Sequence, residues 1–331
     1  ITNGDSAAGT IALTGIGGTV LSWRDLLYEG PVPGGLDAGV LRVVRARYIA
    51  ERGWATVAEA LADLSARDAM LAAGATHDET VLWFEHDLHD QFQLIQILAA
   101  LAALPDRSGR LHLICIGAYP GIEDFRGLGQ LDAAQLASLF PERRPVTAAQ
   151  IELAVRAWRA FRSADPRAIE AVLEDGTAAL PFLGAALRRH LEQFPAAEDG
   201  LGRSERQILA GAARGAATPL ALFAANSSGE EAPFLGDTSF FELIAGLAAG
   251  AVPLLAASDG GALLPPGRPE AGEQFRRQQL TATEAGRSVL AGTADLVRLN
   301  GIDRWLGGVH LHGARSAWRW NRSEGRLVAG G

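Results

Sequence analysis

The sequence contains no lysine, one methionine and one cysteine among its 331 residues. All 30 basic residues are therefore arginine, and the formal net charge of −8 works against general nucleic-acid affinity, because phosphate binding needs a concentrated positive face. Cys115 cannot form an intramolecular disulfide and lies in the apolar run Leu111–Ile116, so we expect a buried thiol. No apolar run reaches 18 residues, which argues against a membrane helix and predicts a cytoplasmic protein without a membrane partner.

The composition that remains is typical of a globular protein. Hydrophobic residues make up 48% of the chain and charged residues 21%, and the length allows two domains. We expect an α/β ligand-binding domain over residues 1–130 and a helical segment packed on it over 131–197, with Asp132, Thr147 and Asp165 as N-caps. A winged-helix-like α+β domain with a C-terminal hairpin is expected over 203–331.

Short apolar runs in the first domain each end in polar residues. They alternate with helical patterns, which predicts an α/β fold with an open, mostly parallel Rossmann-like sheet. The runs are Ile1–Asn3, Thr19–Trp23, Thr80–Phe84 and Leu111–Ile116. Parallel strands end at one edge, where such sheets bind ligands. We therefore expect one polar crevice formed by seven residues: Asp5, Ser6, Asp25, Glu29, Glu85, His86 and Asp87.

The loop after the first run, from Gly4 to Thr10, is a candidate anion site. Its small residues let a ligand approach the backbone, and a helix that begins here presents free N–H groups. We predict ligand contacts from Asp5, Ser6, Gly9 and Thr10. The alternative is that Asp5 or Ser6 only caps the helix.

The tripeptide Gly4-Asp5-Ser6 also resembles the opening block of the Gly-Asp-Ser-Leu esterases, and that resemblance implies that Ser6 is a nucleophile. Those enzymes also carry a Gly-x-Asn-Asp block and an Asp-x-x-His pair, which this sequence lacks. A serine nucleophile needs a base within hydrogen-bond reach, and only His86 or His89 lies in a suitable segment. The hydrolase interpretation is therefore not favoured.

The densest polar cluster follows the third run. Glu85, His86 and Asp87 are predicted catalytic residues, which act either as acid–base groups with shifted pKa values or as metal ligands. The alternative is that Asp87 or Asp90 caps the next helix and the others face solvent. No spaced ligand pair of a known type appears, so the sequence assigns neither a metal nor another cofactor.

An acidic loop follows the second run. Asp25 and Glu29 occupy positions where dinucleotide-binding folds hold the ribose hydroxyls, although a solvated turn accounts for them equally well. Four arginines from this region could clamp an anion: Arg24, Arg42, Arg45 and Arg47. The plainer interpretation is a solvated helix face.

Residues 203–292 resemble a winged helix-turn-helix, with three helices, two short strands and a closing helix that opens on Leu280–Gly286. Such domains commonly read DNA with the third helix. Here that helix, near 237–244, is acidic and has no arginine, so we do not favour DNA as a partner. DNA binding would depend on Arg276, Arg277 and Arg287 around the wing.

The whole chain also resembles an uncharacterised bacterial family through four stretches: Ile1–Gly9, Glu29–Pro31, Phe84–Leu88 and Asp303–Gly308. That family has no settled activity, so the resemblance implies no chemistry. The function we favour is binding of a small anionic molecule or nucleotide in the first domain, with acid–base or metal-assisted catalysis left open. The alternative is a ligand-sensing regulator or interaction protein that uses the winged helix. A homodimer is compatible with both.

Overall fold

The computed structural model describes residues 1–74, 76–104, 110–215, 217–263 and 269–330. The chain divides into two compact units. Unit 1 comprises Ile1–Arg188 with Trp305–His310, and unit 2 comprises Arg189–Arg304 with Leu311–Gly331. Unit 1 thus contains both the predicted ligand-binding domain and most of the predicted helical segment.

Helices and strands alternate irregularly along the chain. Unit 1 holds α1 (Asp5–Ala12), α2 (Ala38–Glu51), α3 (Val57–Gly74), β1 (Glu79–Glu85), α4 (Leu88–Ala102), β2 (Arg110–Ile116), α5 (Ala133–Leu139), β3 (Arg144–Pro145), α6 (Ala148–Phe161) and α7 (Arg167–Asp175). Short 3-10 helices cover Leu128–Gln130 and Phe140–Glu142. Helix α8 (Leu183–Leu191) leads into unit 2, which holds α9 (Arg203–Ala213), α10 (Pro219–Gly229), α11 (Asp237–Ala249), β4 (Leu255–Ala257), α12 (Pro269–Arg277), β5 (Leu280–Ala282), α13 (Glu284–Leu290), α14 (Leu296–Asn300), β8 (Trp318–Asn321) and β9 (Arg326–Ala329). Strands β6 (Ile302–Leu306) and β7 (Val309–Gly313) include residues of both units.

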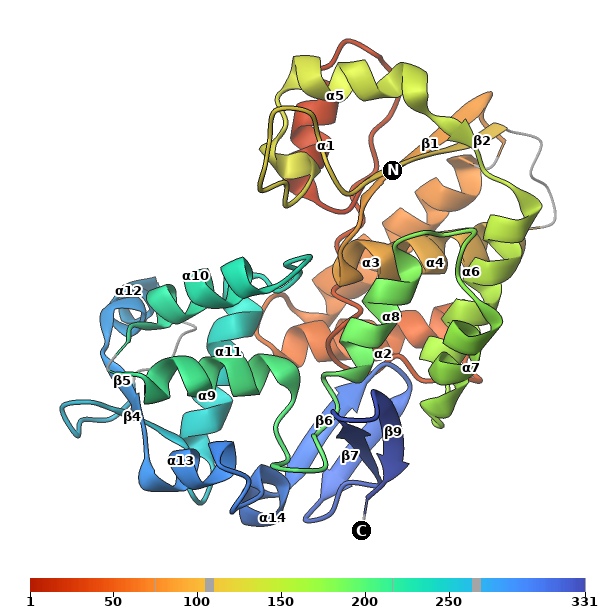
Figure 1. Cartoon of the computed structure of the whole chain (residues 1–331). Coiled ribbons are helices and arrows are strands. Elements are labelled where there is room, and N and C mark those ends of the chain that lie inside the picture. The colour runs from red at the N-terminus through yellow and green to blue at the C-terminus, as the bar shows by residue number, and fades with distance from the viewer. Residues whose placement is uncertain (75, 105–109, 216, 264–268, 331) are drawn as a thin grey trace. The chain divides into compact units, whose positions relative to one another are not determined.

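The sheet of unit 1 has the order β1-β2-β3. Strands β1 and β2 are parallel, with Phe84 opposite Cys115, whereas β3 is antiparallel to β2. Beside β1, Thr2 makes isolated parallel bridges to both Ser22 and Trp83. The backbone segments around Ser22, Thr2, β1 and β2 therefore run side by side in one direction (Figure 1).

The expected mixture of helices and strands is confirmed, but no open, mostly parallel Rossmann-like sheet is evident among the described residues, whose sheets are small. The first two apolar runs form single bridges rather than strands. Helix α1 already begins at Asp5, which ends the pairing of Thr2 after one bridge. A ladder needs several consecutive residues on each strand, and these runs do not supply them.

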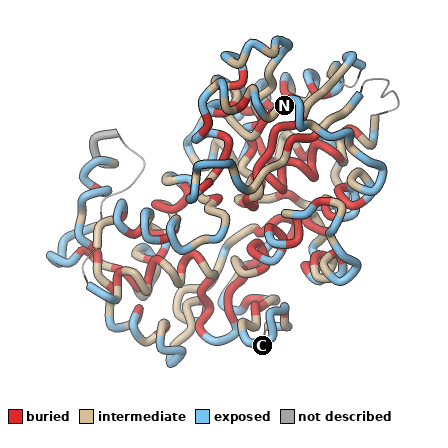
Figure 2. The backbone as a smooth tube through the Cα atoms, turned by 45° about the horizontal axis from the view of Figure 1, so that its top comes forward, coloured by how far each residue is buried: buried red, intermediate tan, exposed pale blue. Residues whose placement is uncertain are grey.

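Two helical layers enclose these strands. Residues from α1, α5 and the loops beside them pack on Trp83 and Ile114, which face one side of the sheet. Helix α4 contacts β1 and α6, and Phe92 of α4 meets Phe161 of α6 with ring centroids 4.4 Å apart. Helix α4 is buried around much of its circumference, as its nearly continuous apolar sequence predicts. Figure 2 shows the buried segments in the interior and the exposed turns outside.

Two of the three predicted helix starts in this unit are confirmed, whereas the N-cap of α7 is Pro166 and not Asp165. The side chains of Asp132 and Thr147 accept hydrogen bonds from the backbone N–H groups of Gln135 and Gln150, at 2.8 and 3.2 Å. Each is the N-cap of the following helix, α5 or α6. Among the described residues, no helix is both long and apolar enough to cross a membrane.

Unit 2 contains three helices, α9 to α11, followed by the antiparallel pair β4 and β5 and the closing helix α13. Helix α12, which the sequence pattern does not predict, lies between the two strands along the chain. An isolated bridge joins Ala217 to Leu280. Phe240, Phe241 and Phe275 form the centre of the core. In place of the expected single C-terminal hairpin there are two separate two-stranded sheets, β6-β7 and β8-β9, and the strands of the second are antiparallel.

Gly286 packs so closely against neighbouring atoms that there is no room for a larger side chain. Its N–H donates to Thr283 Oγ1, which caps α13, at 3.0 Å. A Cβ atom here would lie 2.3 Å from the Leu254 carbonyl oxygen and 3.0 Å from Leu209 Cδ1. We therefore expect Gly286→Ala to lower the free energy of unfolding of unit 2 by roughly 1–3 kcal/mol, because the buried backbone must move.

Urea unfolding combined with hydrogen exchange of the α9 and α13 amides would measure this effect in unit 2 alone. The matched control is Gly246→Ala in α11, where an added Cβ meets nothing within 4 Å. Equal stabilities for the two variants would contradict the steric explanation.

Candidate functional site

The end of β1 brings three carboxyl groups together. Glu85 is the last residue of β1, Asp87 is the N-cap of α4, and Asp90 lies in the first turn of that helix. The Asp90 N–H donates to Asp87 Oδ1 at 2.9 Å, so capping does account for Asp87. All three residues are buried, and ligand atoms of the three lie within 4.8 Å of one another.

Glu85 is held by donors from two other segments. Asn3 Nδ2 donates to Glu85 Oε1 at 3.1 Å and to Asp90 Oδ1 at 2.7 Å. The Leu128 N–H donates to the same Glu85 oxygen at 2.6 Å. A Cβ on Gly127 would lie 2.1 Å from Glu85 Oε2, so only glycine allows the carboxyl group to approach this closely. The carboxyl group therefore has one fixed position.

Burial changes the charge state of this cluster. Burial raises the pKa of Glu85 to about 7, although the hydrogen bonds from Leu128 and Asn3 act in the opposite direction. Burial and the neighbouring Glu85 raise the pKa of Asp87 to about 8, and burial and both neighbours raise the pKa of Asp90 well above its usual value. Such a cluster holds protons near neutral pH, or it holds a divalent cation with oxygen ligands.

A cavity of about 360 Å³ opens beside Glu85. The residues that line it come from the start of α1, the end of β1, α4 and the loop before α5: Asn3, Gly4, Asp5, Ser6, Ala7, Glu85, His89, Arg126, Gly127, Gly129 and Gln130. Helix α1 begins at the cavity, and within the described residues no side chain caps its N-terminus. Its first backbone N–H groups therefore add positive potential beside the carboxyl group.

The cavity brings together only some of the predicted residues. Asp5, Ser6 and Glu85 line it. Of the other two predicted on α1, Gly9 is exposed and Thr10 donates its hydroxyl to the Ser6 carbonyl oxygen. Neither is among the lining residues, because the helix carries them a turn away from its N-terminus.

His86 and Asp87 also lie outside the lining. The His86 ring is 6.3 Å from the Phe125 ring and 5.9 Å from the Phe182 ring, between centroids. Alternation along an extended backbone directs adjacent side chains to opposite sides, so Glu85 and His86 do not share a face. Asp87 turns toward the backbone of α4, as its capping contact requires.

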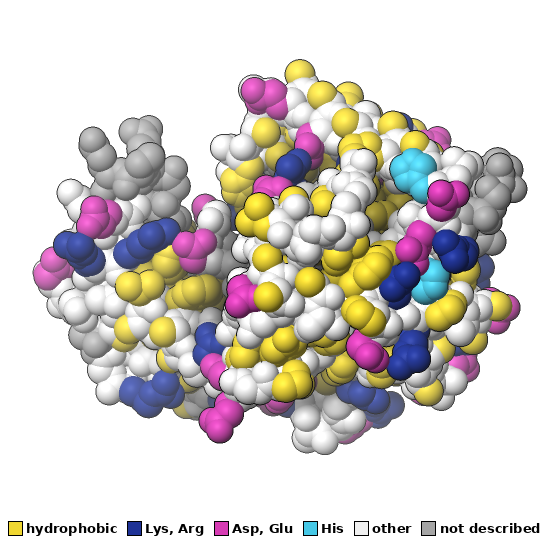
Figure 3. Space-filling view, turned by 90° about the horizontal axis from the view of Figure 1, so that it is seen from above, with side chains coloured by type: hydrophobic (Ala, Val, Ile, Leu, Met, Phe, Trp, Pro, Cys, Tyr) yellow, Lys and Arg dark blue, Asp and Glu magenta, His cyan; other side chains and the backbone are white. Residues whose placement is uncertain are grey.

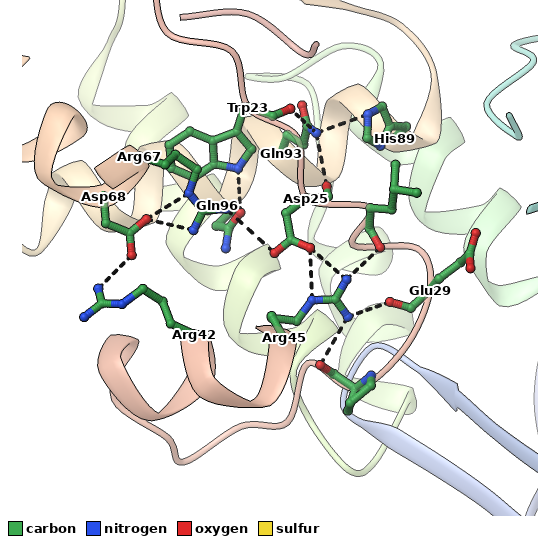
Figure 4. A network of polar contacts seen from close by, with 12 residues as sticks. Trp23, Asp25, Glu29, Arg42, Arg45, Arg67, Asp68, His89, Gln93 and Gln96 are labelled. Carbon is green, nitrogen blue, oxygen red and sulfur yellow. Dashed lines mark hydrogen bonds and ion pairs between the residues drawn. The ribbon is translucent and has the colours of Figure 1, made fainter. Parts of the chain in front are cut away.

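Asp25 and Glu29 belong to a different network, so the expectation of one crevice for all seven residues is not met (Figure 4). Asp25 accepts from Arg45 at 2.7 Å and is nearly inaccessible to solvent. Glu29 accepts from the Tyr48 hydroxyl at 3.0 Å. Buried Gln93 of α4 donates to the carbonyl oxygen of Asp25 at 3.1 Å.

The geometry does not favour a serine nucleophile. Ser6 and His89 line the same cavity, yet no hydrogen bond joins them within the described residues. His89 Nε2 lies 3.1 Å from Gln93 Nε2, and burial lowers the pKa of His89 to about 4. An imidazole with so low a pKa is a weak base for a serine hydroxyl.

Asn3, Gly127 and Leu128 complete the site, and sequence reasoning missed them. Asn3 is the polar last residue of the first run, directly before the loop that begins at Gly4, and this position could have indicated a site residue. The segment 127–130 offers no comparable signal, because its contribution is backbone proximity. Cys115, expected as a buried thiol, is partly exposed, and Gln91 Nε2 lies 3.4 Å from its Sγ.

A larger cavity of about 700 Å³ lies at the other, amino end of the strands. It is lined by Ile1, Val81, Met70 and Phe140 among others. Its acidic neighbour Glu79 already pairs with Arg143 at 2.8 Å. The cavity beside Glu85 is lined by a carboxyl group with a raised pKa, so it is the stronger candidate for a functional site.

The arginines proposed for DNA binding in unit 2 are engaged locally. Arg276 pairs with Asp237 of α11 at 2.9 Å, Arg277 pairs with Glu273 at 2.6 Å, and Arg287 donates to the Ala282 carbonyl oxygen at 2.7 Å. On the face drawn in Figure 3, acidic and arginine side chains are interspersed. These contacts do not favour DNA as a partner.

A comparison of the chain with protein-family models and with curated proteins returns no match, so the resemblances drawn from the sequence stay predictions.

Proposed function

We propose that unit 1 binds a small anionic molecule or a nucleotide in the cavity beside Glu85, and that Glu85 acts there as an acid–base group. The observation that carries the proposal is a buried carboxyl group that lines an open cavity and has a pKa of about 7. Strongly shifted carboxyl groups in clefts are characteristic of functional sites. The cavity volume also lies in the range of small-ligand sites.

The surroundings of Glu85 support an anionic ligand. The N-terminus of α1 supplies backbone donors, and Arg126, which also pairs with Asp124 at 2.6 Å, is among the lining residues. Asp5 does not oppose this, because Arg24 pairs with it at 2.8 Å. The protonated form of Glu85 adds no negative charge and offers a hydrogen-bond donor. A ligand phosphate or carboxylate at this position would meet donors from α1, from Arg126 and from protonated Glu85.

The acid–base assignment depends on how Glu85 is held. Asn3 and Leu128 both donate to Oε1, which leaves Oε2, beside Gly127, for the proton. A pKa near the working pH lets one group both donate and accept a proton. Burial favours the protonated form of Glu85, and Asn3, which donates to both Glu85 and Asp90, would act as a positioning residue.

Native mass spectrometry of the full chain, followed by calorimetric titration with AMP and inorganic phosphate, would test the proposal. We expect a retained small molecule or saturable binding of at least one probe. Gly127→Ala should weaken that binding roughly tenfold or more, because the added methyl group displaces the Glu85 carboxyl group. Binding should also weaken above pH 7, as Glu85 ionises.

The matched control is Gly9→Ala. Gly9 lies on α1 outside the cavity lining, and a Cβ there meets nothing within 4 Å. If Gly9→Ala and Gly127→Ala weaken binding equally, the site is wrongly placed. If neither probe binds and no molecule is retained, the proposed ligand class is wrong. The alternative function is a ligand-sensing regulator or interaction protein that uses the winged helix. Arg276, Arg277 and Arg287 of unit 2 already have partners within that unit, so they offer this alternative no support.

A further inference from the structure

Unit 1 contains a second cavity of about 360 Å³, enclosed by α2, α3, α4 and α6. It shares no lining residue with the cavity beside Glu85. Four arginines and two aspartates line one part of it: Arg42, Arg45, Arg67, Arg162, Asp25 and Asp68. Apolar side chains line the rest, among them Trp23, Leu41, Leu64, Leu71, Ala100 and Trp158.

The two aspartates leave an excess of positive charge. Asp25 is shared between Arg45, at 2.7 Å, and Arg67, whose Nη1 lies 3.7 Å from Asp25 Oδ2 (Figure 4). Asp68 is likewise shared between Arg67 and Arg42, at 2.7 and 2.9 Å. Arg162 donates to the carbonyl oxygens of Pro33 and Leu36 rather than to a carboxylate. Four guanidinium groups therefore face two carboxylates.

One donor at this end of the cavity is left unsatisfied. Arg67 is 7% exposed, and its Nη1 has no hydrogen-bond partner within the described residues. Asp25 Oδ2 lies 3.7 Å from this nitrogen in an ion pair and also makes no hydrogen bond among those residues. A buried donor without a hydrogen bond is costly, and it is stabilised when an anionic ligand accepts from it. The guanidinium group lies 4.0 Å from the centre of the Trp23 ring, which fixes its direction.

From this arrangement we infer that the second cavity binds a carboxylate that carries an aliphatic chain. The carboxylate accepts hydrogen bonds from the arginine end, where the planar guanidinium groups match its two oxygens. The chain lies against the leucine, alanine and tryptophan side chains of the other end, which remove it from water. A small inorganic anion would leave that apolar surface uncovered.

Calorimetric titration of the full chain with sodium decanoate, and with decan-1-ol as the neutral counterpart, tests the inference. We expect saturable decanoate binding that is roughly tenfold or more tighter than decan-1-ol binding, because charge-assisted hydrogen bonds distinguish the two probes. Arg42→Gln should reduce the decanoate affinity several-fold and leave decan-1-ol unchanged. Arg42 is partly exposed, so this substitution preserves the fold.

Ala100→Phe should abolish decanoate binding by filling the apolar end, whereas Ala102→Phe, on α4 but outside the lining, should not. Gly127→Ala should leave decanoate binding unchanged, because that substitution alters only the first cavity. Equal affinity for the two probes, or full decanoate affinity in a folded Ala100→Phe variant, would overturn the inference. These results do not depend on whether AMP or phosphate binds beside Glu85.

Discussion

Replacing Asp25 by asparagine is expected to lower the free energy of unfolding of unit 1 by about 3–5 kcal/mol, because a buried arginine then lacks its counter-charge. Arg45 is 2% exposed and Arg67 is 7% exposed, and both pair with Asp25. Burial by itself would raise the pKa of Asp25, but these two arginines outweigh it and hold the pKa below its usual value. The carboxylate therefore stays charged in the folded protein.

Asp68→Asn is the matched control for this prediction. Asp68 pairs with Arg42 and Arg67 in the same network, but its side chain is 22% exposed. Its partly solvated pair with Arg42 contributes about 1 kcal/mol or less. Arg67, which donates to Asp68 through Nε and Nη2, keeps Asp25 as a counter-charge, so this variant should lose less stability than Asp25→Asn. Urea unfolding with hydrogen exchange of the α4 amides measures unit 1 separately. If Asp25→Asn and Asp68→Asn lower the free energy of unfolding by similar amounts, Asp25 is not the essential counter-charge of the buried arginines.

Glu85→Gln is expected to make the protein more stable than the wild type at alkaline pH. The pKa of Glu85 is about 7 in the fold against a usual value of 4.5, so its contribution to stability is complete below pH 4.5 and is lost as the pH rises through 7. Glutamine resembles the protonated group and does not ionise. The difference in unfolding free energy should therefore grow between pH 4.5 and 7 to roughly 3 kcal/mol and then level off.

Denaturant unfolding of both proteins at pH 5, 7 and 9 gives this difference directly, because titrating groups outside the cluster of Glu85, Asp87 and Asp90 contribute nearly equally to both proteins. Glu79→Gln is the control at the opposite end of β1. The hydrogen bond from Arg143 lowers the pKa of Glu79, so its contribution is already complete above pH 4.5. The difference in unfolding free energy between Glu79→Gln and the wild type should therefore be the same at pH 5, 7 and 9. A constant difference for Glu85→Gln as well would contradict a raised pKa.

Local sequence signals predicted the helix starts and the position of the carboxyl cluster. Asp132 and Thr147 cap helices because a short polar side chain can reach an N–H group three residues ahead, and that geometry needs no distant partner. Glu85 is the last residue of strand β1, and the sequence shows this position directly as the first charged residue after an apolar run. The extent of the sheet could not be predicted in this way, because Thr2 and Ser22 pair through single bridges that depend on distant backbone.

By itself, the sequence determined where polar residues follow apolar runs, and therefore which carboxyl groups stand at strand ends. Only the tertiary structure decided which of those groups share a cavity. It placed Asp25 with Arg45 and Arg67, and it brought Asn3, Gly127 and Leu128 to Glu85. The physical reason is that a pKa depends on burial and on neighbours distant in sequence, which residue spacing along the chain does not encode.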